Sequence, residues 1–333
     1  MTKDTTRLFS RVKALVERGE RISMDDCESL LVQTDLIGLA SLARVPRERR
    51  FGRSAFALGV PVVDYYPGLV SVARGDADGG DYNPGALLRL ATARGIDVND
   101  LIRVLQGASC AIMLPASSFH RAHRADTIRL LETIADRSAG CSALITDIHQ
   151  CNSDMPAGAI EDWKETHEEA HEHGISSIAV VSYGPTEDAM AIASRLELIR
   201  SVQDRTGGFI GISLHAQDND QAVDSYKRAP AALETLRLSA VTRLYLDNVS
   251  HLMIAPRLVG AEVAVLALSY GIDAIDDWTT GPDLDPEEGL GGVATEARAT
   301  RSAHVRDRLI EARWREVSVD GSFNPMPSSV FTR

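Results

Sequence analysis

Short apolar runs alternate with amphipathic stretches from about residue 55 onwards. The apolar runs predict strands at Ala57–Asp64, Leu69–Ala73, Cys110–Leu114, Ala143–Asp147, Ser177–Ser182, Phe209–Leu214, Arg243–Leu246 and Asp273–Ile275. The amphipathic stretches predict helices at Thr127–Ala135, Ile160–His173, Glu187–Asp204, Ala231–Ala240 and Pro256–Tyr270. Strands that alternate with helices indicate a parallel sheet. About eight strands over this length favour an α/β fold of the β/α-barrel type over an open sheet.

The two ends of the chain show a different pattern. Residues 1–54 predict an N-terminal helical segment, in which Leu8, Val12, Leu15 and Val16 form one apolar stripe. A second helical region, Ser23–Ala43, follows with Ser23 as its N-cap candidate. We therefore expect three parts: helices in 1–54, the β/α barrel in 55–282, and a C-terminal helix (Thr300–Trp314) with an irregular tail in 283–333, packed on the barrel.

Composition and charge narrow the class of partner. The chain has 333 residues, is 44% hydrophobic and carries a net charge of −12, which argues against nucleic acid and suits a small-molecule substrate. No apolar run approaches the roughly 20 residues that span a bilayer, and the charged N-terminus has no signal-peptide pattern. We therefore expect no membrane association and a cytoplasmic location. The oligomeric state is open, with a homodimer as one option.

Polar residues follow most of the predicted strands. In β/α barrels the chemistry takes place where the carboxyl ends of the strands meet, so these residues are the candidates for a site. They are Asp147, His149, Tyr183, Gly184, Glu187, His215, Asp247, Asn248 and Arg74. For each one taken singly, the alternative is a capping or solvated side chain at a strand end.

The candidates suggest two kinds of role. His149 and His215 are the candidate acid–base catalysts, because an imidazole exchanges protons near neutral pH, and Asp147 or Asp247 would orient them. Tyr183, Gly184 and Glu187 form a compact turn, whose amide and carboxylate could hold ribose hydroxyls. The alternative for Glu187 is a helix N-terminus, where its charge is favourable. Asn248 and Arg74 complete the set of cofactor-binding candidates.

One stretch spells H-E-x-x-H, from His167 to His171, a string that on a helix can bind zinc. Ile160, Trp163 and His167 recur at helical spacing, so His167 is expected on the packed face of its helix. His171 lies in the last turn, where a partly charged imidazole suits the helix C-terminus. We therefore interpret this helix as structural and predict no metal there.

Four segments together resemble a known family. They are "RGERISMDDCESLLVQTDLIGLASLA", "YGPTEDAM", "GGFIGISLHAQ" and "RLYLDNVSHLMIAPRLVGAEVAVLALSYGIDAIDD". They resemble the radical SAM enzymes of menaquinone and deazaflavin biosynthesis: aminofutalosine synthase, dehypoxanthine futalosine cyclase and the deazaflavin synthase subunits. The resemblance covers most of the chain, except that residues 55–155 are divergent. It implies a barrel of the radical SAM type and S-adenosylmethionine as a cofactor.

The cysteines depart from this family. The family's C-x-x-x-C-x-x-C loop, after the first barrel strand, holds a [4Fe–4S] cluster through three thiolates. The chain has four cysteines, Cys27, Cys110, Cys141 and Cys151, and none lies between the first two. Cys141 and Cys151 flank a predicted strand and cannot imitate the loop. We therefore expect the cluster to be absent.

Three functional hypotheses follow. The first is a cluster-less enzyme, a transferase or lyase, that binds S-adenosylmethionine or a nucleoside-like molecule and performs polar rather than radical chemistry. The second is a non-catalytic binding partner of a radical SAM enzyme. The third is a metal-dependent enzyme whose site is rebuilt from His120, His123, His149 or His215.

Overall fold

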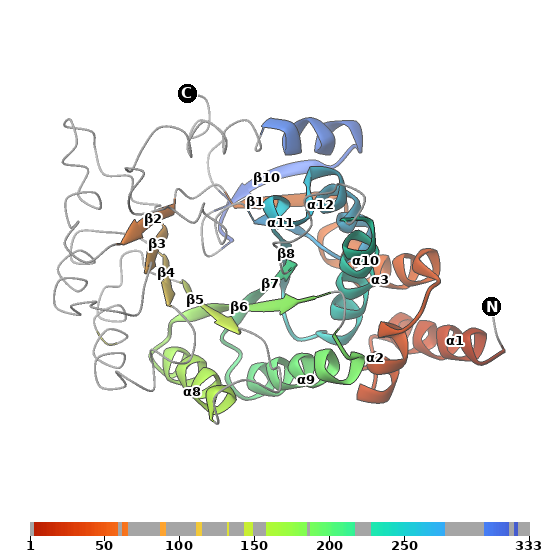
Figure 1. The fold of residues 1–333 in the computed structure, drawn as a ribbon, viewed down its shortest axis with the longest axis horizontal. Coiled ribbons are helices and arrows are strands. Elements are labelled where there is room, and N and C mark those ends of the chain that lie inside the picture. Colours follow the sequence, from red (N-terminus) through yellow and green to blue (C-terminus); the bar gives the residue numbers. More distant parts are fainter. Residues whose placement is uncertain are drawn as a thin grey trace. The chain divides into compact units, whose positions relative to one another are not determined.

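The structure is a computed structural model, shown in Figure 1. It describes residues 3–58, 62–65, 87–90, 111–114, 132, 143–148, 158–184, 187–216, 228–276, 303–319 and 323–325. The chain divides into two compact units that interleave along the sequence. The first comprises Met1–Ala57, Ser182–Arg200 and Ser213–Val317, and the second comprises Leu58–Val181, Ser201–Ile212 and Ser318–Arg333.

Three helices open the first unit: α1 (Lys3–Arg18), α2 (Met24–Leu31) and α3 (Leu36–Phe51). The Ser23 hydroxyl accepts a hydrogen bond from the Asp26 amide at 3.1 Å, which confirms Ser23 as an N-cap. The region predicted as Ser23–Ala43 is two helices, because the Asp35 carboxylate caps a new one by accepting from the Gly38 amide at 2.9 Å. The apolar stripe of α1 is buried at Leu8, Val12 and Val16.

The first unit holds, wholly or in part, the strands β1 (Ser54–Leu58), β6 (Ser176–Tyr183), β7 (Phe209–Ala216), β8 (His251–Ile254), β9 (Ala274–Asp276) and β10 (Arg315–Val319). Their hydrogen-bonded order is β10-β1-β9-β8-β7-β6. β8 and β9 are parallel, with Met253 opposite Ala274.

The second unit adds β2 (Val62–Tyr65), β3 (Leu87–Leu90), β4 (Ala111–Leu114) and β5 (Ala143–Ile148). They continue from the first part of β6 in the order β6-β5-β4-β3-β2. Each neighbouring pair is parallel, and Ile145 of β5 lies opposite Ile178 of β6. The predicted parallel sheet is therefore confirmed.

The helices after the first strands are α8 (Ala159–Glu172), α9 (Ala189–Thr206), α10 (Arg228–Tyr245), α11 (Pro256–Val259), α12 (Ala261–Ala267) and the 3-10 turn η2 (Leu268–Tyr270). Residues 303–311 form one more helix. In the first unit, α10 packs against α3, α2 and α12, and Figure 1 shows α10 beside α3. The core there includes Leu39 of α3 and Val241 of α10, each fully buried. Among the described residues, none of the helices has the length and hydropathy to cross a membrane.

The prediction of a strand at Arg243–Leu246 was wrong. Residues 243–245 are the end of α10, and Leu246 follows the helix directly. The next strand is β8, which begins only at His251. Leu238, Val241 and Tyr245 are buried at helical spacing, so the apolar run belongs to a helix that packs on both sides. Short apolar runs do not distinguish a buried helix from a buried strand.

Other boundaries also differ from the prediction. Ala57–Asp64 falls on two strands, β1 and β2, with 59–61 undescribed. The stretch Pro256–Tyr270 is divided at Gly260, whose φ of +87° no helix accepts. The pattern of hydrophobic and polar positions in the sequence did not predict β3, β8 or β10. Leu69–Ala73 and nearly all of Thr127–Ala135 lie outside the described residues.

Residues 303–317, near the C-terminus, belong to the first unit. The guanidinium groups of Arg47 and Arg53 both lie over the Trp314 ring, at 4.2 and 4.3 Å from its centre. The buried Arg47 donates to the carbonyl oxygens of Ile272, Gly52 and Ser54. Burial lowers the pKa of Arg47 to about 10.

Candidate functional site

The strand β6 ends in a buried tyrosine. Every position of β6 from Ser177 to Tyr183 is buried, as expected for a parallel strand covered on both faces. The Tyr183 phenol shares a hydrogen bond with the Thr235 hydroxyl of α10. Burial raises the pKa of Tyr183 far above its ordinary value of 10.0. The phenol is thus a neutral anchor between β6 and α10.

The turn after β6 is closed by a carboxylate. The Gly184 amide donates to Glu187 Oε2 at 3.2 Å, and the Arg195 guanidinium of α9 donates to Glu187 Oε1. Arg195 also donates to the Ser182 carbonyl at 2.6 Å. Arg195 and Glu187 are 1% and 11% exposed, so this is a buried ion pair. Both carboxylate oxygens of Glu187 therefore support the turn, although each keeps a lone pair that a ligand could use.

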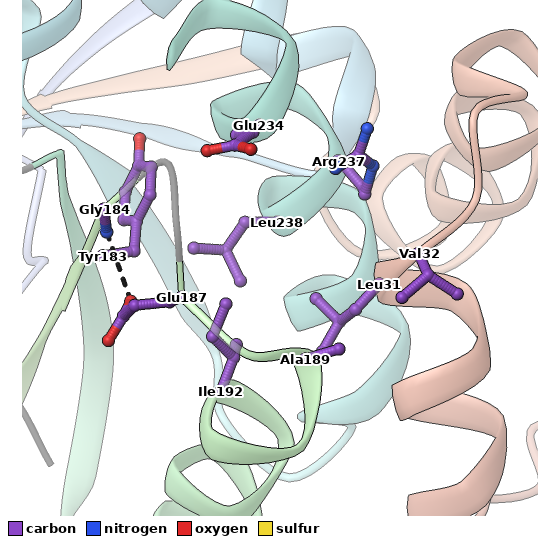
Figure 2. Close-up of a pocket in the computed structure, with 10 residues that line it drawn as sticks. All are labelled: Leu31, Val32, Tyr183, Gly184, Glu187, Ala189, Ile192, Glu234, Arg237 and Leu238. Atoms are coloured by element: carbon purple, nitrogen blue, oxygen red, sulfur yellow. Dashed lines mark hydrogen bonds between the residues drawn. The ribbon is translucent and has the colours of Figure 1, made fainter. Parts of the chain in front are cut away.

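This turn lines a pocket within the first unit. The pocket has a cavity volume of about 160 Å³, and its lining comes from α2 and the residue after it, the turn, and the helices α9 and α10. The lining residues are Leu31, Val32, Tyr183, Gly184, Glu187, Ala189, Ile192, Glu234, Arg237 and Leu238. Figure 2 shows Tyr183, Gly184 and Glu187 on one side and Leu31 and Val32 on the other. Three of the five predicted cofactor-binding residues are thus brought together.

Sequence reasoning missed two charged residues of this pocket, Glu234 and Arg237 of α10. Partial burial raises the pKa of Glu234, and the nearby Arg237 opposes that rise. Arg237 donates through Nε to the Gln33 carbonyl at 2.8 Å. Both residues lie within a helix. The candidates were chosen because they follow predicted strands, so Glu234 and Arg237 were not among them.

The remaining predicted residues have different positions. His215 and Asp147 are each the next-to-last residue of their strands, β7 and β5. Alternation along β7 puts the half-buried His215 on the same face as Phe209. His149 and Arg74 lie outside the described residues, as do His120 and His123.

Asp247 and Asn248 do not lie where the prediction put them. They follow the C-terminus of α10 and precede β8, so they are at the amino end of that strand. Asp247 accepts from Arg21 at 3.0 Å and pairs with Arg200 at 3.5 Å. The Asn248 side-chain amide donates to the Arg200 carbonyl at 3.0 Å. The reason for assigning them a role, a position at a carboxyl end, is therefore removed.

The histidine of the same segment is part of a buried network. His251 begins β8, and its Nδ1 lies 2.7 Å from Asp273, which also pairs with Arg243. The imidazole stacks on Phe51 at 5.1 Å. Asp273 is fully buried and accepts from the Leu252 amide at 2.8 Å. This network joins α10, β8 and β9 at the amino ends of the strands, away from the end where barrel enzymes react.

Both histidines of the H-E-x-x-H helix contact hydroxyl groups of neighbouring elements. His167 of α8 is fully buried, and its Nδ1 lies 2.8 Å from the Ser177 hydroxyl of β6. His171 contacts the same hydroxyl at 2.8 Å and the Thr206 hydroxyl at 2.6 Å. Burial holds the pKa of His167 well below 6.5 and lowers that of His171 to about 4. The expected partial charge on His171 is therefore wrong. Of the residues that the structure describes, no three metal-ligating side chains are placed to hold an ion.

The chain is similar in sequence to curated enzymes of the group that its four segments resemble. A cyclic dehypoxanthine futalosine synthase from Streptomyces coelicolor is 34% identical over 34% of this chain and 28% of its own. A 5-amino-6-(D-ribitylamino)uracil–L-tyrosine 4-hydroxyphenyl transferase from Methanoculleus marisnigri is 27% identical over 68% of this chain and 52% of its own. The matches thus span about a quarter to a half of these relatives. No family model matches the chain.

Solved structures agree on the fold. The methylornithine synthase PylB is similar over 96% of this chain and 98% of its own, with a TM-score of 0.61 and 15% identity. HydG from Carboxydothermus hydrogenoformans, an FeFe-hydrogenase maturase, is similar over 96% and 82%, with a TM-score of 0.65 and 12% identity. The α/β fold is therefore that of the radical SAM β/α-barrel enzymes, as predicted. The distant homologues of this chain are radical SAM enzymes of the futalosine and deazaflavin pathways.

Proposed function

We propose that this protein is an enzyme related to the radical SAM enzymes that binds S-adenosylmethionine, or another nucleoside-like molecule, and acts on a small molecule in the cytoplasm without an iron–sulfur cluster. The observation that carries the proposal is the turn after β6. Tyr183, Gly184 and Glu187, selected from the sequence as cofactor-binding residues, line one pocket. The homology to enzymes that use S-adenosylmethionine supports this choice of ligand.

The size of the pocket limits what it encloses. A cavity of about 150 Å³ is known to hold benzene, and this one measures about 160 Å³. It accommodates one end of S-adenosylmethionine, so the rest of such a ligand would extend beyond it.

The cysteines support operation without a cluster. The sequence has no cysteine between Cys27 and Cys110, the part that follows the first strand. Cys27 is fully buried in α2, and burial raises the pKa of its thiol to about 12. A metal is held by the thiolate and not by the thiol, so Cys27 is a poor ligand for iron.

The polar chemistry available to such an enzyme needs no electron donor. S-adenosylmethionine carries a sulfonium, and a nucleophile or base can break a carbon–sulfur bond so that the electron pair returns to sulfur. His149 and His215 are the acid–base candidates for this step, and Asp147 is the candidate to orient one of them.

The test separates the two parts of the proposal. After anaerobic reconstitution with iron and sulfide, we expect no stoichiometric iron or acid-labile sulfide on the purified chain, and no 5′-deoxyadenosine on reduction with dithionite. A full [4Fe–4S] complement per chain, with 5′-deoxyadenosine formed from S-adenosylmethionine, would overturn cluster-free chemistry. The binding part is tested by titrating the iron-free protein with S-adenosylmethionine and adenosine in a calorimeter.

A matched pair of variants ties the binding to the turn. Glu187→Gln removes the charge that closes the turn, and Glu48→Gln removes an exposed carboxylate that pairs with Arg44 one helix turn away. We expect Glu187→Gln, measured on protein that remains folded, to weaken binding of the nucleoside ligand about tenfold, because the turn that lines the pocket loses its charged hydrogen bonds. Glu48→Gln should leave it unchanged.

A further inference from the structure

The pocket beside the turn is lined by two opposite charges that form no ion pair with each other. Glu234 and Arg237 both line it and stand three residues apart on α10. Within the described part of the chain, the Glu234 carboxylate has no hydrogen-bond or ion-pair partner. Arg237 uses only its Nε, toward the Gln33 carbonyl at 2.8 Å. Its two terminal amino groups have no partner among the described residues.

The other charged residue of the lining is already neutralised. Glu187 is paired with Arg195, which is 1% exposed. The charges left for a ligand are therefore one carboxylate and one guanidinium, and their sum is zero. A guanidinium with two free amino groups matches a carboxylate in bidentate geometry, and a carboxylate matches an ammonium group.

Most of the remaining lining is apolar. Leu31, Ile192 and Leu238 line the same cavity, and so does Val32, which is 62% exposed. Figure 2 shows Glu234 and Arg237 along one edge of this apolar lining. A ligand that fits has two opposite charges close together and a short aliphatic part, of about the size that a 150 Å³ cavity holds.

We propose that this pocket binds the head group of an α-amino acid, with Arg237 on the carboxylate, Glu234 on the ammonium group, and the aliphatic side chain against Leu31, Ile192 and Leu238. Two sources carry this chemistry: a free apolar amino acid and the methionyl end of S-adenosylmethionine. The second source rests on the proposed function, whereas the first does not.

The experiment uses four ligands of nearly equal shape or shared head group, each titrated into the full chain by calorimetry. L-Methionine has both charges, its 2-hydroxy analogue lacks the ammonium group, and L-methioninol lacks the carboxylate. S-Adenosylmethionine carries the same head group on a larger body. We expect methionine to bind at one site, and each single-charge analogue to bind about tenfold more weakly or worse, as for loss of one charged hydrogen-bonded pair.

Variants assign each charge to its partner. In Glu234→Gln, methionine and the 2-hydroxy analogue should bind equally, because the ammonium group has lost its partner. In Arg237→Gln, methionine and methioninol should bind equally. Arg44→Gln removes an exposed guanidinium paired with Glu48 and serves as the control that leaves all affinities unchanged. Such cycles isolate a pairwise interaction from a general loss of affinity.

The outcomes decide between this site and the proposed function. If methionine binds with the expected pattern but S-adenosylmethionine and adenosine do not, the amino-acid site stands and the proposed function falls. If S-adenosylmethionine and adenosine bind and neither variant changes them, while methionine does not bind, the proposed function stands and the amino-acid site falls. The amino-acid site is also overturned if neither Glu234→Gln nor Arg237→Gln changes the affinity for methionine. The absence of binding by all of these ligands overturns it as well.

Discussion

The turn after β6 and the helix α8 are both rich in ionisable residues, yet they use them in opposite ways. In α8, His167 and His171 turn inward onto the Ser177 hydroxyl, so their hydrogen-bonding capacity serves the fold. At the turn, Glu187 serves the fold through Arg195, but Glu234 and Arg237 beside it face a cavity.

A sequence motif therefore does not define a site unless the partners of its side chains are known. H-E-x-x-H has the right spacing for zinc, but burial keeps both imidazoles neutral and occupied. Glu234 and Arg237 match no motif, yet they are the charges that remain for a ligand. Substitution of residues that serve the fold should therefore change stability, whereas substitution of residues that only face the cavity should not.

The largest loss of stability is expected from the buried ion pair of the turn. Arg195→Ala leaves Glu187 without its cation and the Ser182 carbonyl without its donor. Breaking a buried pair from one side typically destabilises by about 3–5 kcal/mol, which urea-induced unfolding would measure. The double variant Arg195→Met with Glu187→Met should recover much of this loss, because no unpaired charge stays buried. Equal losses in the single and double variants would contradict this account of the pair.

A smaller loss is expected in α8. His167→Ala removes a fully buried ring that packs at 4.8 Å from Phe209 and 4.6 Å from Trp163. The cavity and the lost hydrogen bond to the Ser177 hydroxyl should cost about 2–4 kcal/mol in the free energy of unfolding. Glu172→Gln, at the exposed end of the same helix, should change it by less than about 0.5 kcal/mol. Ligand binding by the folded His167→Ala protein should be unchanged, and a loss of binding would give α8 a role that the structure does not.

The same histidines predict an acid-sensitive stability. The unfolded chain protonates them near their ordinary pKa of 6.5, whereas burial lowers the pKa of folded His171 to about 4. The unfolded state therefore binds more protons below pH 6.5, and stability that is complete above that pH is lost as the pH falls toward 4.

The slope is at most about 1.4 kcal/mol per pH unit for each histidine, and smaller for the half-buried His171 because solvent screens it. Unfolding measured from pH 7 to 4.5 should be less steep in His171→Gln than in the natural chain. An unchanged slope would show that His171 is not held neutral.

The smallest effect on stability is expected where the charges face the cavity. Glu234→Gln removes a carboxylate that has no partner among the described residues, so the free energy of unfolding should change by less than about 0.5 kcal/mol. A loss as large as that of Arg195→Ala would show that Glu234 serves the fold, and the contrast between the two regions would fail. Thermal unfolding of Glu234→Gln and Arg195→Ala under the same conditions makes this comparison.

The periodicity of the sequence revealed much of the fold, and its failures have physical reasons. The strands β4 to β7 and the helix α8 were found because their apolar runs are bounded by turn residues. Arg243–Leu246 was misassigned because a helix covered on both sides has as continuous an apolar pattern as a buried strand. This error also placed Asp247 and Asn248 at the wrong end of a strand.

The candidate site could be predicted from the sequence only in part. Tyr183, Gly184 and Glu187 were selected because they end a strand, and they do line one pocket. Glu234 and Arg237 could not be found this way, because their place in the lining depends on how α10 packs against α2 and β6. Which charges are already paired, such as Glu187 with Arg195, is likewise a property of packing and not of local sequence.

Cluster-free binding of S-adenosylmethionine is best tested by calorimetry on the iron-free protein under anaerobic conditions. We expect saturable binding at one site per chain, with the same affinity before and after incubation with iron and sulfide. Binding that is absent from the iron-free chain, or that arises only once a cluster has been assembled, would contradict this expectation.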